Sequence, residues 1–303
     1  MPTREALRGA GKTALGAAMI RAAESGRADR LFDDPYAQAF LDAVPAAFPG
    51  LPAAGIEHAG DAGPMSAGAA FCARAAVRTR FFDDYLSDAA SAGCRQVVLL
   101  AAGLDARAFR LAWPPGTRVF EVDVPGVLAF KDEVLARRRA TARCERVTVP
   151  ADLSQDWAER LAGAGLDPAS QAAWLAEGVL LYLTTGEAGR LLSRVSALSA
   201  PGSRLGFEHS PAAADELAAQ ARRLSALREY AALWKGGLGD GAPAWLVAHG
   251  WRPEFRGLAA VAGCYRREVA GPRRGGFLTA TRGTPGAPTR YPTGPISAPA
   301  SSA

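Results

Sequence analysis

The sequence predicts an α/β fold built on a doubly wound, mostly parallel sheet. From residue 95 onward, short apolar runs alternate with helical patterns. The apolar runs are continuous and rich in β-branched residues, which indicates strands that are covered on both faces. Repeated alternation of such strands with helices is typical of a doubly wound sheet.

The elements follow from these patterns in chain order. Helices are expected at about Thr13 to Ser25 and Ala67 to Ala90, with the segment FDDPYAQAFL between them. Five strands then follow, at residues 95–103, 118–124, 146–153, 172–183 and 203–210. The crossover helices are expected at 125–140, 154–165 and 184–198, with Ser154 and Thr185 as N-caps of the last two. After Pro211 we expect a long helix to about Trp234, a short helix at Ala244 to His249, and strands at Trp251–Arg256 and Gly275–Thr281.

The composition is that of a soluble, core-forming protein. Hydrophobic residues make up 49% and charged residues 21% of the 303 residues, which excludes global disorder. No apolar run is long enough to cross a membrane, and the first residues lack a secretory signal, so we expect a cytoplasmic protein. The four cysteines are scattered without a CxxC pair, which favours free thiols and no metal site.

The basic charge is weak evidence for a nucleic-acid partner. The net charge is +5 with a pI near 9.3, but only three of the 35 basic residues are lysines. This arginine bias, with abundant Ala and Gly, is typical of a GC-rich genome. The one dense basic run, Leu135 to Val147, is expected to be a solvated helix end. We expect neither nucleic acid nor a membrane as a partner.

Acidic or small residues stand at the carboxyl ends of the first two strands, where open α/β sheets bind ligands. Gly103 either lets a ligand approach the backbone closely or belongs to an ordinary turn. Asp123 follows 20 residues later, at the spacing typical of a carboxylate that binds ribose hydroxyls. Alternatively, or in addition, Asp123 caps the helix that begins near Pro125.

The third and fourth strands extend this pattern. Asp152 is a candidate acceptor for an adenine amino group and Leu153 for packing on the ring, although the same residues fit a capping box. Glu177 stands in an otherwise apolar run, where an unpaired carboxylate is costly, so we expect it to have a functional role. The pattern suits any adenosine-containing cofactor, NAD included, and the spacing alone does not choose.

Longer stretches resemble the leucine carboxyl methyltransferase-like family, and more narrowly its actinobacterial branch of S-adenosyl-L-methionine-dependent methyltransferases. They are FDDPYA, RTRFFDDYL, RQVVLLAAGLDARAFRLAWP, VFEVDVPGVLAFK, ADLSQDW, WLAEGVLLYL and SAPGSRLGFEHS, in this order. The resemblance covers roughly residues 10–282. It implies a class I methyltransferase (Rossmann-like) fold, with a seven-stranded sheet, an antiparallel last strand and N-terminal helices over the site. We therefore expect a helical cover at 1–90, a cofactor-binding core at 91–282 with a helical insertion at about 211–250, and a disordered Pro/Gly/Ser-rich tail at 283–303.

The resemblance also implies residue roles. Arg78 would bind the methionine carboxylate of S-adenosyl-L-methionine, with Arg74 and Arg80 as its neighbours in register. An arginine fork matches a carboxylate bidentately. The turn at Ala101 reads AAG where the eukaryotic members resemble GAG, and an alanine fits there if its φ is negative. The other implied cofactor contacts are Gly103 at the turn, Asp123 on the ribose, Asp152 and Leu153 around the adenine, and Glu177 beside the methionine portion.

Four further features are candidates for the acceptor side. A hydroxyl acceptor needs a base, and His209 is the candidate, with an ordinary strand-end residue as the alternative. Arg107 and Arg110 either attract an anionic acceptor or are solvated helix positions. The segment FDDPYA either shapes the acceptor pocket or is only a turn that starts a helix. The Gly-rich residues 236–243 are expected to form a loop near the acceptor.

We therefore expect an S-adenosyl-L-methionine-dependent O-methyltransferase that acts on a small molecule by direct in-line transfer. A carboxylate acceptor is already ionised at pH 7 and needs no base, so positioning and desolvation would supply most of the acceleration. The alternatives are a catalytically silent cofactor-binding protein and a nicotinamide-dependent oxidoreductase, against which the missing GxGxxG counts. A nucleic-acid methyltransferase is disfavoured because no NPPY or PCQ element and no basic–aromatic stripe is present.

Overall fold

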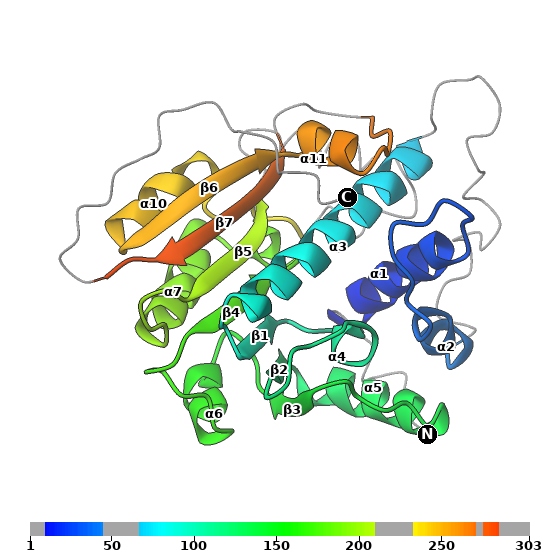
Figure 1. Ribbon diagram of the computed structural model, residues 1–303, viewed down its shortest axis with the longest axis horizontal. Helices are drawn as coiled ribbons and strands as arrows, with labels where there is room; N and C mark the ends of the chain where they lie inside the picture. The colour runs from blue at the N-terminus through cyan, green and yellow to red at the C-terminus, as the bar shows by residue number, and fades with distance from the viewer. Residues whose placement is uncertain (1–9, 45–66, 210–232, 271–274, 285–303) are drawn as a thin grey trace.

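The computed structural model describes residues 10–44, 67–209, 233–270 and 275–284. Its centre is a seven-stranded sheet of order β3-β2-β1-β4-β5-β7-β6 (Figure 1). Neighbouring strands from β3 to β5 are parallel, whereas β7 runs antiparallel to both β5 and β6. This confirms the seven-stranded sheet with one reversed strand. The strands are β1 Gln96–Leu100, β2 Arg118–Asp123, β3 Glu145–Pro150, β4 Ala172–Ala176, β5 Arg204–His209, β6 Trp251–Gly257 and β7 Gly276–Arg282.

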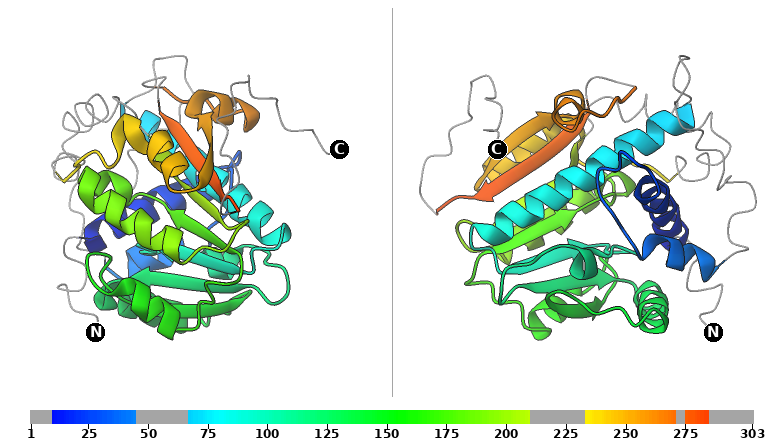
Figure 2. Two further views of the ribbon diagram at one scale, coloured as in Figure 1. Left: turned by 90° about the vertical axis from the view of Figure 1, so that its left-hand side faces the viewer. Right: turned by 45° about the vertical axis from the view of Figure 1, so that its right-hand side comes forward.

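Helices cover both faces of the sheet (Figures 1 and 2). The long helix α3 crosses one face diagonally, and α5 and α11 share its hydrophobic core cluster. Helices α6, α7 and α10 contribute to the cluster on the opposite face. The helices are α1 Ala10–Ser25, α2 Ala37–Asp42, α3 Ala67–Ser91, α4 Arg107–Arg110, α5 Pro125–Arg137, α6 Trp157–Gly163, α7 Thr185–Ala197, α10 Ala242–Ala248 and α11 Leu258–Cys264, with short 3-10 helices η1 Leu180–Tyr182 and η2 Gly239–Gly241.

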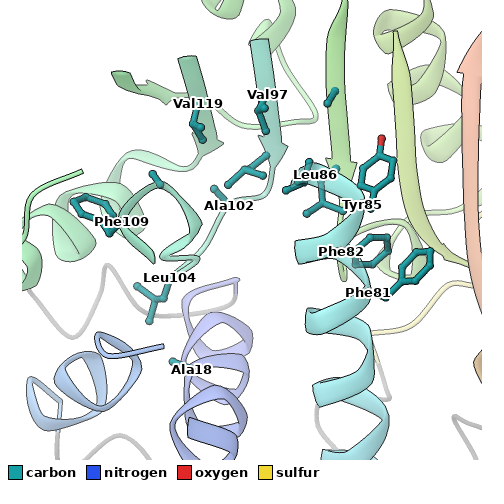
Figure 3. Close-up of a cluster of buried hydrophobic side chains, with 14 of the residues drawn as sticks. Ala18, Phe81, Phe82, Tyr85, Leu86, Val97, Ala102, Leu104, Phe109 and Val119 are labelled. Atoms are coloured by element: carbon teal, nitrogen blue, oxygen red, sulfur yellow. The ribbon is translucent and has the colours of Figure 1, made fainter. Parts of the chain in front are cut away.

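The two core clusters follow from the alternation of side chains along each strand. In β1, Val97 and Leu99 face the α3 side, and Val98 and Leu100 face the other. Figure 3 shows the α3 side, where Phe81, Phe82, Tyr85 and Leu86 pack along the helix. A Cβ at Gly206 of β5 would lie 2.9 Å from the Tyr85 ring, so this glycine lets α3 approach the sheet closely.

Helix α1 lies beyond the carboxyl end of β1. In Figure 3, Ala18 of this helix lies below the turn that carries Ala102 and Leu104. Arg21 of α1 donates a hydrogen bond from Nη2 to the Leu104 carbonyl, at 2.7 Å. The carboxyl edge of the sheet and the N-terminal helix are therefore held together directly.

Some expected boundaries were wrong. The fourth strand ends at Ala176 and not near residue 183, because the apolar run continues into η1, whose Leu180 is buried in the same core. The N-cap of α7 is Thr184 and not Thr185, and Thr184 forms a capping box with Glu187. The N-cap of α6 is Asp156 and not Ser154, and it makes no side-chain cap hydrogen bond.

The division into a cover at 1–90 and a core at 91–282 stays a prediction. Helix α3, which that division places in the cover, shares one buried cluster with the sheet. The expected helix after Pro211 falls largely on residues outside the described ranges, as does nearly all of the expected tail at 283–303. Within the described ranges, no helix is both long and apolar enough to cross a membrane.

Candidate active site at the carboxyl edge of the sheet

The turn after β1 is fixed by the end of β2. The backbone N–H of Gly103 donates to Asp123 Oδ2 at 2.6 Å, which brings together two residues that the sequence placed at adjacent strand ends. Gly103 has a φ of +52°, and a Cβ there would lie 3.2 Å from the Ala14 Cβ of α1. Ala101 has a φ of +51°, so the condition for an unstrained alanine at this turn, a negative φ, is not met. The turn therefore holds a non-glycine residue in the left-handed region.

Asp123 is buried, and both of its carboxylate oxygens accept backbone hydrogen bonds. Oδ2 accepts from Gly103 and Oδ1 from Val124, at 2.7 Å. Val124, and not Asp123, is the N-cap of α5, so the capping alternative is wrong in its strict form. Burial raises the pKa of Asp123, although the two backbone donors act against this. Each oxygen has a further lone pair that can accept a hydrogen bond from a ligand hydroxyl.

Asp152 and Leu153 lie in the loop after β3, next to the end of β2. The Ala151 N–H donates to the Asp123 carbonyl at 2.9 Å, which sets this loop beside Asp123. Asp152 is exposed, and its Oδ1 accepts from the backbone N–H and the hydroxyl of Ser154, at 2.8 and 2.7 Å. Leu153 is half-buried against the core. Their roles around an adenine stay predictions.

Glu177 shares Arg78 with a second carboxylate. Arg78 of α3 donates from Nε to Glu177 Oε1 at 2.9 Å and from Nη1 to Glu208 Oε1 at 2.8 Å. Glu208, near the end of β5, also accepts from the Gly178 N–H, at 3.0 and 2.8 Å to its two oxygens. Residues from three distant parts of the chain thus form one polar cluster at the carboxyl edge.

Arg107 joins this cluster to further ion pairs, in which Arg110 takes part. Arg107, with 1% of its surface exposed, donates from Nε to Asp83 Oδ1 at 2.6 Å and also pairs with Asp105. Its Nη1 lies 2.8 Å from Glu177 Oε2. Arg110 binds Asp83 through both terminal nitrogens, each at 2.6 Å. The alternative that these arginines are solvated helix positions was wrong, because both pair with carboxylates of the protein. Attraction of an anionic acceptor by them stays a prediction.

The charges in this cluster shift several pKa values. Burial raises the pKa of Asp105, but Arg107 and Arg21 outweigh burial and lower the value to about 2. Burial also raises the pKa of Glu177, and Arg107 and Arg78 reverse the direction, so its net pKa is lowered. The pKa of Glu208 is raised, because burial and Glu177 outweigh Arg78. Perturbed carboxylates at one strand edge are typical of a functional site.

His209 lies on the other side of the sheet from Arg78. It follows Glu208 in β5, and adjacent residues of a strand point to opposite faces. Its ring meets Phe255 of β6 edge to face, with 5.7 Å between ring centroids. It is 7% exposed, and burial lowers its pKa. A catalytic role for His209 stays a prediction.

The Gly-rich segment lies against the loop that follows β4. The backbone N–H groups of Lys235 and Gly236 donate to the Leu181 carbonyl, at 2.8 and 3.2 Å, and that of Gly237 donates to the Leu183 carbonyl at 2.9 Å. Tyr182, between these two acceptors, interacts electrostatically with Arg78 and Glu208. The segment is therefore next to the polar cluster, and its role in acceptor binding stays a prediction.

The segment FDDPYA forms a turn that starts α2. Asp34 is 2% exposed, and its Oδ1 accepts from the N–H groups of Tyr36 and Ala37, each at 3.1 Å. Its Oδ2 accepts from Arg21 Nε at 3.0 Å. The turn interpretation is confirmed, and a contribution of this segment to an acceptor pocket stays a prediction.

The residues at the sheet edge fit S-adenosyl-L-methionine. Asp123 retains acceptor capacity for ribose hydroxyls. The half-buried carboxylates of Glu177 and Glu208 give the neighbourhood negative charge, which favours a sulfonium cation. Arg78 carries donors of the geometry that a carboxylate binds.

Sequence reasoning missed Glu208. This residue stands in an apolar strand as Glu177 does, and this signal could have found it.

Comparison with known proteins gives one family. The model of the leucine carboxyl methyltransferase family matches residues 14–196. A protein of Parafrankia sp. strain EAN1pec is 52% identical over 278 residues, covering 90% of this chain and 87% of that protein. A protein of Streptomyces avermitilis is 42% identical over 276 residues, covering 89% of this chain and 94% of that protein. Both relatives carry the name of S-adenosyl-L-methionine-dependent methyltransferases.

Proposed function

The chain belongs to the leucine carboxyl methyltransferase family and is an S-adenosyl-L-methionine-dependent methyltransferase, and on this premise we propose that it methylates an oxygen atom of a small-molecule acceptor. A carboxylate is the first candidate acceptor, as the family description suggests. The nicotinamide alternative, which residue spacing left open, is set aside by the family.

One observation carries the proposal: the buried carboxylate of Asp123 and the half-buried carboxylates of Glu177 and Glu208, at the ends of β2, β4 and β5, lie at a single edge, with Arg78 between the two glutamates. A bound S-adenosyl-L-methionine supplies an electrophilic methyl group on a sulfonium. In the proposal, Arg78 holds its carboxylate and Asp123 its ribose, and Glu177 lies beside the methionine portion. These contacts position the methyl group for in-line attack, which is where most of the rate enhancement would arise.

The acceptor decides whether a base is needed. A carboxylate is ionised at neutral pH, so residues that orient it suffice. A hydroxyl must lose a proton, and His209 is the predicted base for that case. Under a carboxylate acceptor, we expect His209→Gln to leave the methylation rate within about twofold of the wild type.

The first experiment is calorimetric titration of the full chain with S-adenosyl-L-methionine, with NAD and NADP as controls. Saturable binding of S-adenosyl-L-methionine alone is expected. Binding of NAD alone would overturn the cofactor assignment. A variant with Arg78→Ala should lose about 2–3 kcal/mol of binding free energy if it holds the carboxylate. If Arg78→Ala leaves the binding free energy unchanged, the carboxylate must be bound by another residue, and Arg74 or Arg80 becomes the candidate.

The acceptor class is then tested by transfer of a labelled methyl group to panels of small carboxylic acids, phenols and alcohols. Methyl esters release volatile methanol in mild alkali, whereas methyl ethers do not, so the product itself reports which oxygen was methylated. Label in alkali-stable nitrogen or carbon products would contradict O-methylation. Tight cofactor binding without transfer to any panel member would favour the silent cofactor-binding protein.

The remaining expectations belong to this proposal. A small molecule is proposed as the partner, rather than a nucleic acid or a membrane. A cytoplasmic location is proposed as well, and the free thiols of all four cysteines support it: Cys72, Cys94, Cys144 and Cys264.

A further inference from the structure

Two guanidinium nitrogens of Arg78 already donate hydrogen bonds to carboxylates of the protein. A guanidinium offers a carboxylate two bidentate edges, one formed by Nε with Nη2 and the other by both terminal nitrogens. Nε is bonded to Glu177 and Nη1 to Glu208. Each bidentate edge therefore contains one nitrogen that already binds a glutamate. A cofactor carboxylate that binds Arg78 bidentately would share Nη1 with Glu208 or the single N–H of Nε with Glu177, which brings two carboxylates onto one nitrogen.

The two glutamates are not held equally. Glu177 has a second cation, because its Oε2 lies 2.8 Å from Nη1 of Arg107. Arg107 is itself fixed by Asp83 and Asp105 in a site with 1% exposure. Besides Arg78, Glu208 accepts hydrogen bonds from the neutral Gly178 N–H. Glu208 is therefore held by fewer charged partners than Glu177.

The main charged neighbour of Glu208 is Arg78. Helix α3 contributes Arg78, and the loop after β4 contributes the like-charged Glu177 and the hydroxyl of Tyr182. On the neighbouring strand β7, the residue paired with Glu208 is the apolar Phe277. Arg78 is the cation with the largest effect on this carboxylate. The pKa of Glu208 is already raised by burial and by Glu177, and loss of its contact with Arg78 would raise this pKa further.

We propose that Glu208 is a positioning residue that holds Arg78 ready for the cofactor, and that it takes up one proton when the cofactor's carboxylate displaces it. The proton comes from solvent and goes to a carboxylate oxygen of Glu208, and no covalent bond of the cofactor changes. The Gly178 N–H continues to hold the neutral carboxyl group. This inference rests on the cofactor placement used in the proposed function.

The test is calorimetric titration of the full chain with S-adenosylhomocysteine, which carries the same carboxylate and has no methyl group to transfer. Titrations at pH 7 in three buffers of different ionisation enthalpy give the number of protons bound from the slope of enthalpy against buffer enthalpy. We expect a clear uptake, approaching one proton, for the wild type. The affinity should also fall as pH rises, by up to tenfold per pH unit.

The variant Glu208→Gln can still accept hydrogen bonds from Arg78 and Gly178 but has no carboxylate to protonate. We expect it to bind with a slope near zero and with an affinity that does not depend on pH. Glu254→Gln is the matched control, since Glu254 is an exposed partner of Arg256 on β6. It should keep the wild-type slope. A merely structural role for Glu208 would change affinity or stability without removing proton uptake.

Each other outcome has a defined meaning. A wild-type slope of zero would overturn the inference, since Glu208 would then keep a cation, either Arg78 or the cofactor's ammonium group. Uptake that survives in Glu208→Gln would also overturn it. Unchanged affinity in Arg78→Lys would show that the carboxylate binds elsewhere. These titrations contain no acceptor, so proton uptake can be interpreted even if the protein is found not to methylate oxygen atoms.

Discussion

Loss of the Arg107 guanidinium should destabilise the protein strongly. Arg107 is 1% exposed and faces three carboxylates: Asp83, Asp105 and Glu177. In Arg107→Met, which keeps much of the side-chain volume, Asp83 retains Arg110 and Glu177 retains Arg78. Asp105 loses its closest cation. Breaking a buried ion pair by removing one partner costs about 3–5 kcal/mol, so we expect a loss of about 4 kcal/mol in the free energy of unfolding.

The assay is urea unfolding followed by circular dichroism, with the midpoint and the slope fitted separately. The control is Arg256→Met, because Arg256 and Glu254 form an exposed pair on β6. Such a pair contributes less than about 1 kcal/mol. The double variant Arg107→Met/Asp105→Asn should recover part of the loss, since the neutral amide no longer needs a cation. A loss below about 1 kcal/mol in Arg107→Met would refute the electrostatic reasoning.

Three more predictions concern single residues at the sheet edge. Asp123→Ala should weaken S-adenosyl-L-methionine binding by about 100-fold, because two hydrogen bonds to a charged acceptor are lost; unchanged affinity by calorimetry, with intact circular dichroism, would contradict the ribose assignment. Asp105 has a pKa lowered to about 2, so its contribution to stability is complete above the unfolded value near 4 and is lost as pH falls toward 2. Asp105→Asn should therefore show a smaller fall in the free energy of unfolding between pH 5 and pH 2.5 than the wild type, by about 2 kcal/mol, as measured by urea unfolding. Equal falls would argue against the pairing. Ala101→Gly should raise stability by about 0.5–1 kcal/mol, because relief of the left-handed strain exceeds the added chain entropy; a lower melting temperature would show that the turn is not strained.

The strands could be predicted because their side chains are buried on both faces. All five residues of β1 are buried, and an unbroken apolar run is what such a strand requires. The same reasoning extended β4 too far, because η1 is apolar for the same reason. An apolar run indicates that a segment is buried. Hydropathy does not show which backbone hydrogen bonds the segment makes, and these distinguish a strand from a 3-10 helix.

The N-cap of α7 shows a different limit. Thr184 and Thr185 are neighbours of the same type, and each could cap a helix. The choice depends on which hydroxyl reaches the backbone N–H of Glu187 and which backbone N–H Glu187 reaches in return. Sequence spacing constrains such an N-terminus to within a residue or two.

The candidate site was predictable where it depends on strand ends and not where it depends on helix docking. Gly103 and Asp123 meet because adjacent parallel strands end at the same edge. The pairing of Asp83 with Arg107 and Arg110 depends on where α3 crosses the sheet, which no local pattern specifies. Glu208 could have been predicted by the argument that selected Glu177, namely that an unpaired carboxylate within an apolar run is costly.

The backbone contacts of Lys235–Gly237 have an evolutionary consequence. These contacts, like the pairing of His209 with Gly276 in the sheet, are made by the backbone and do not depend on which side chains the residues carry. Side chains at these positions can therefore change without moving the strands that carry Asp123, Glu177 and Glu208. Relatives that share this backbone are free to differ in the side chains of the segment while they keep the same arrangement of carboxylates at the sheet edge.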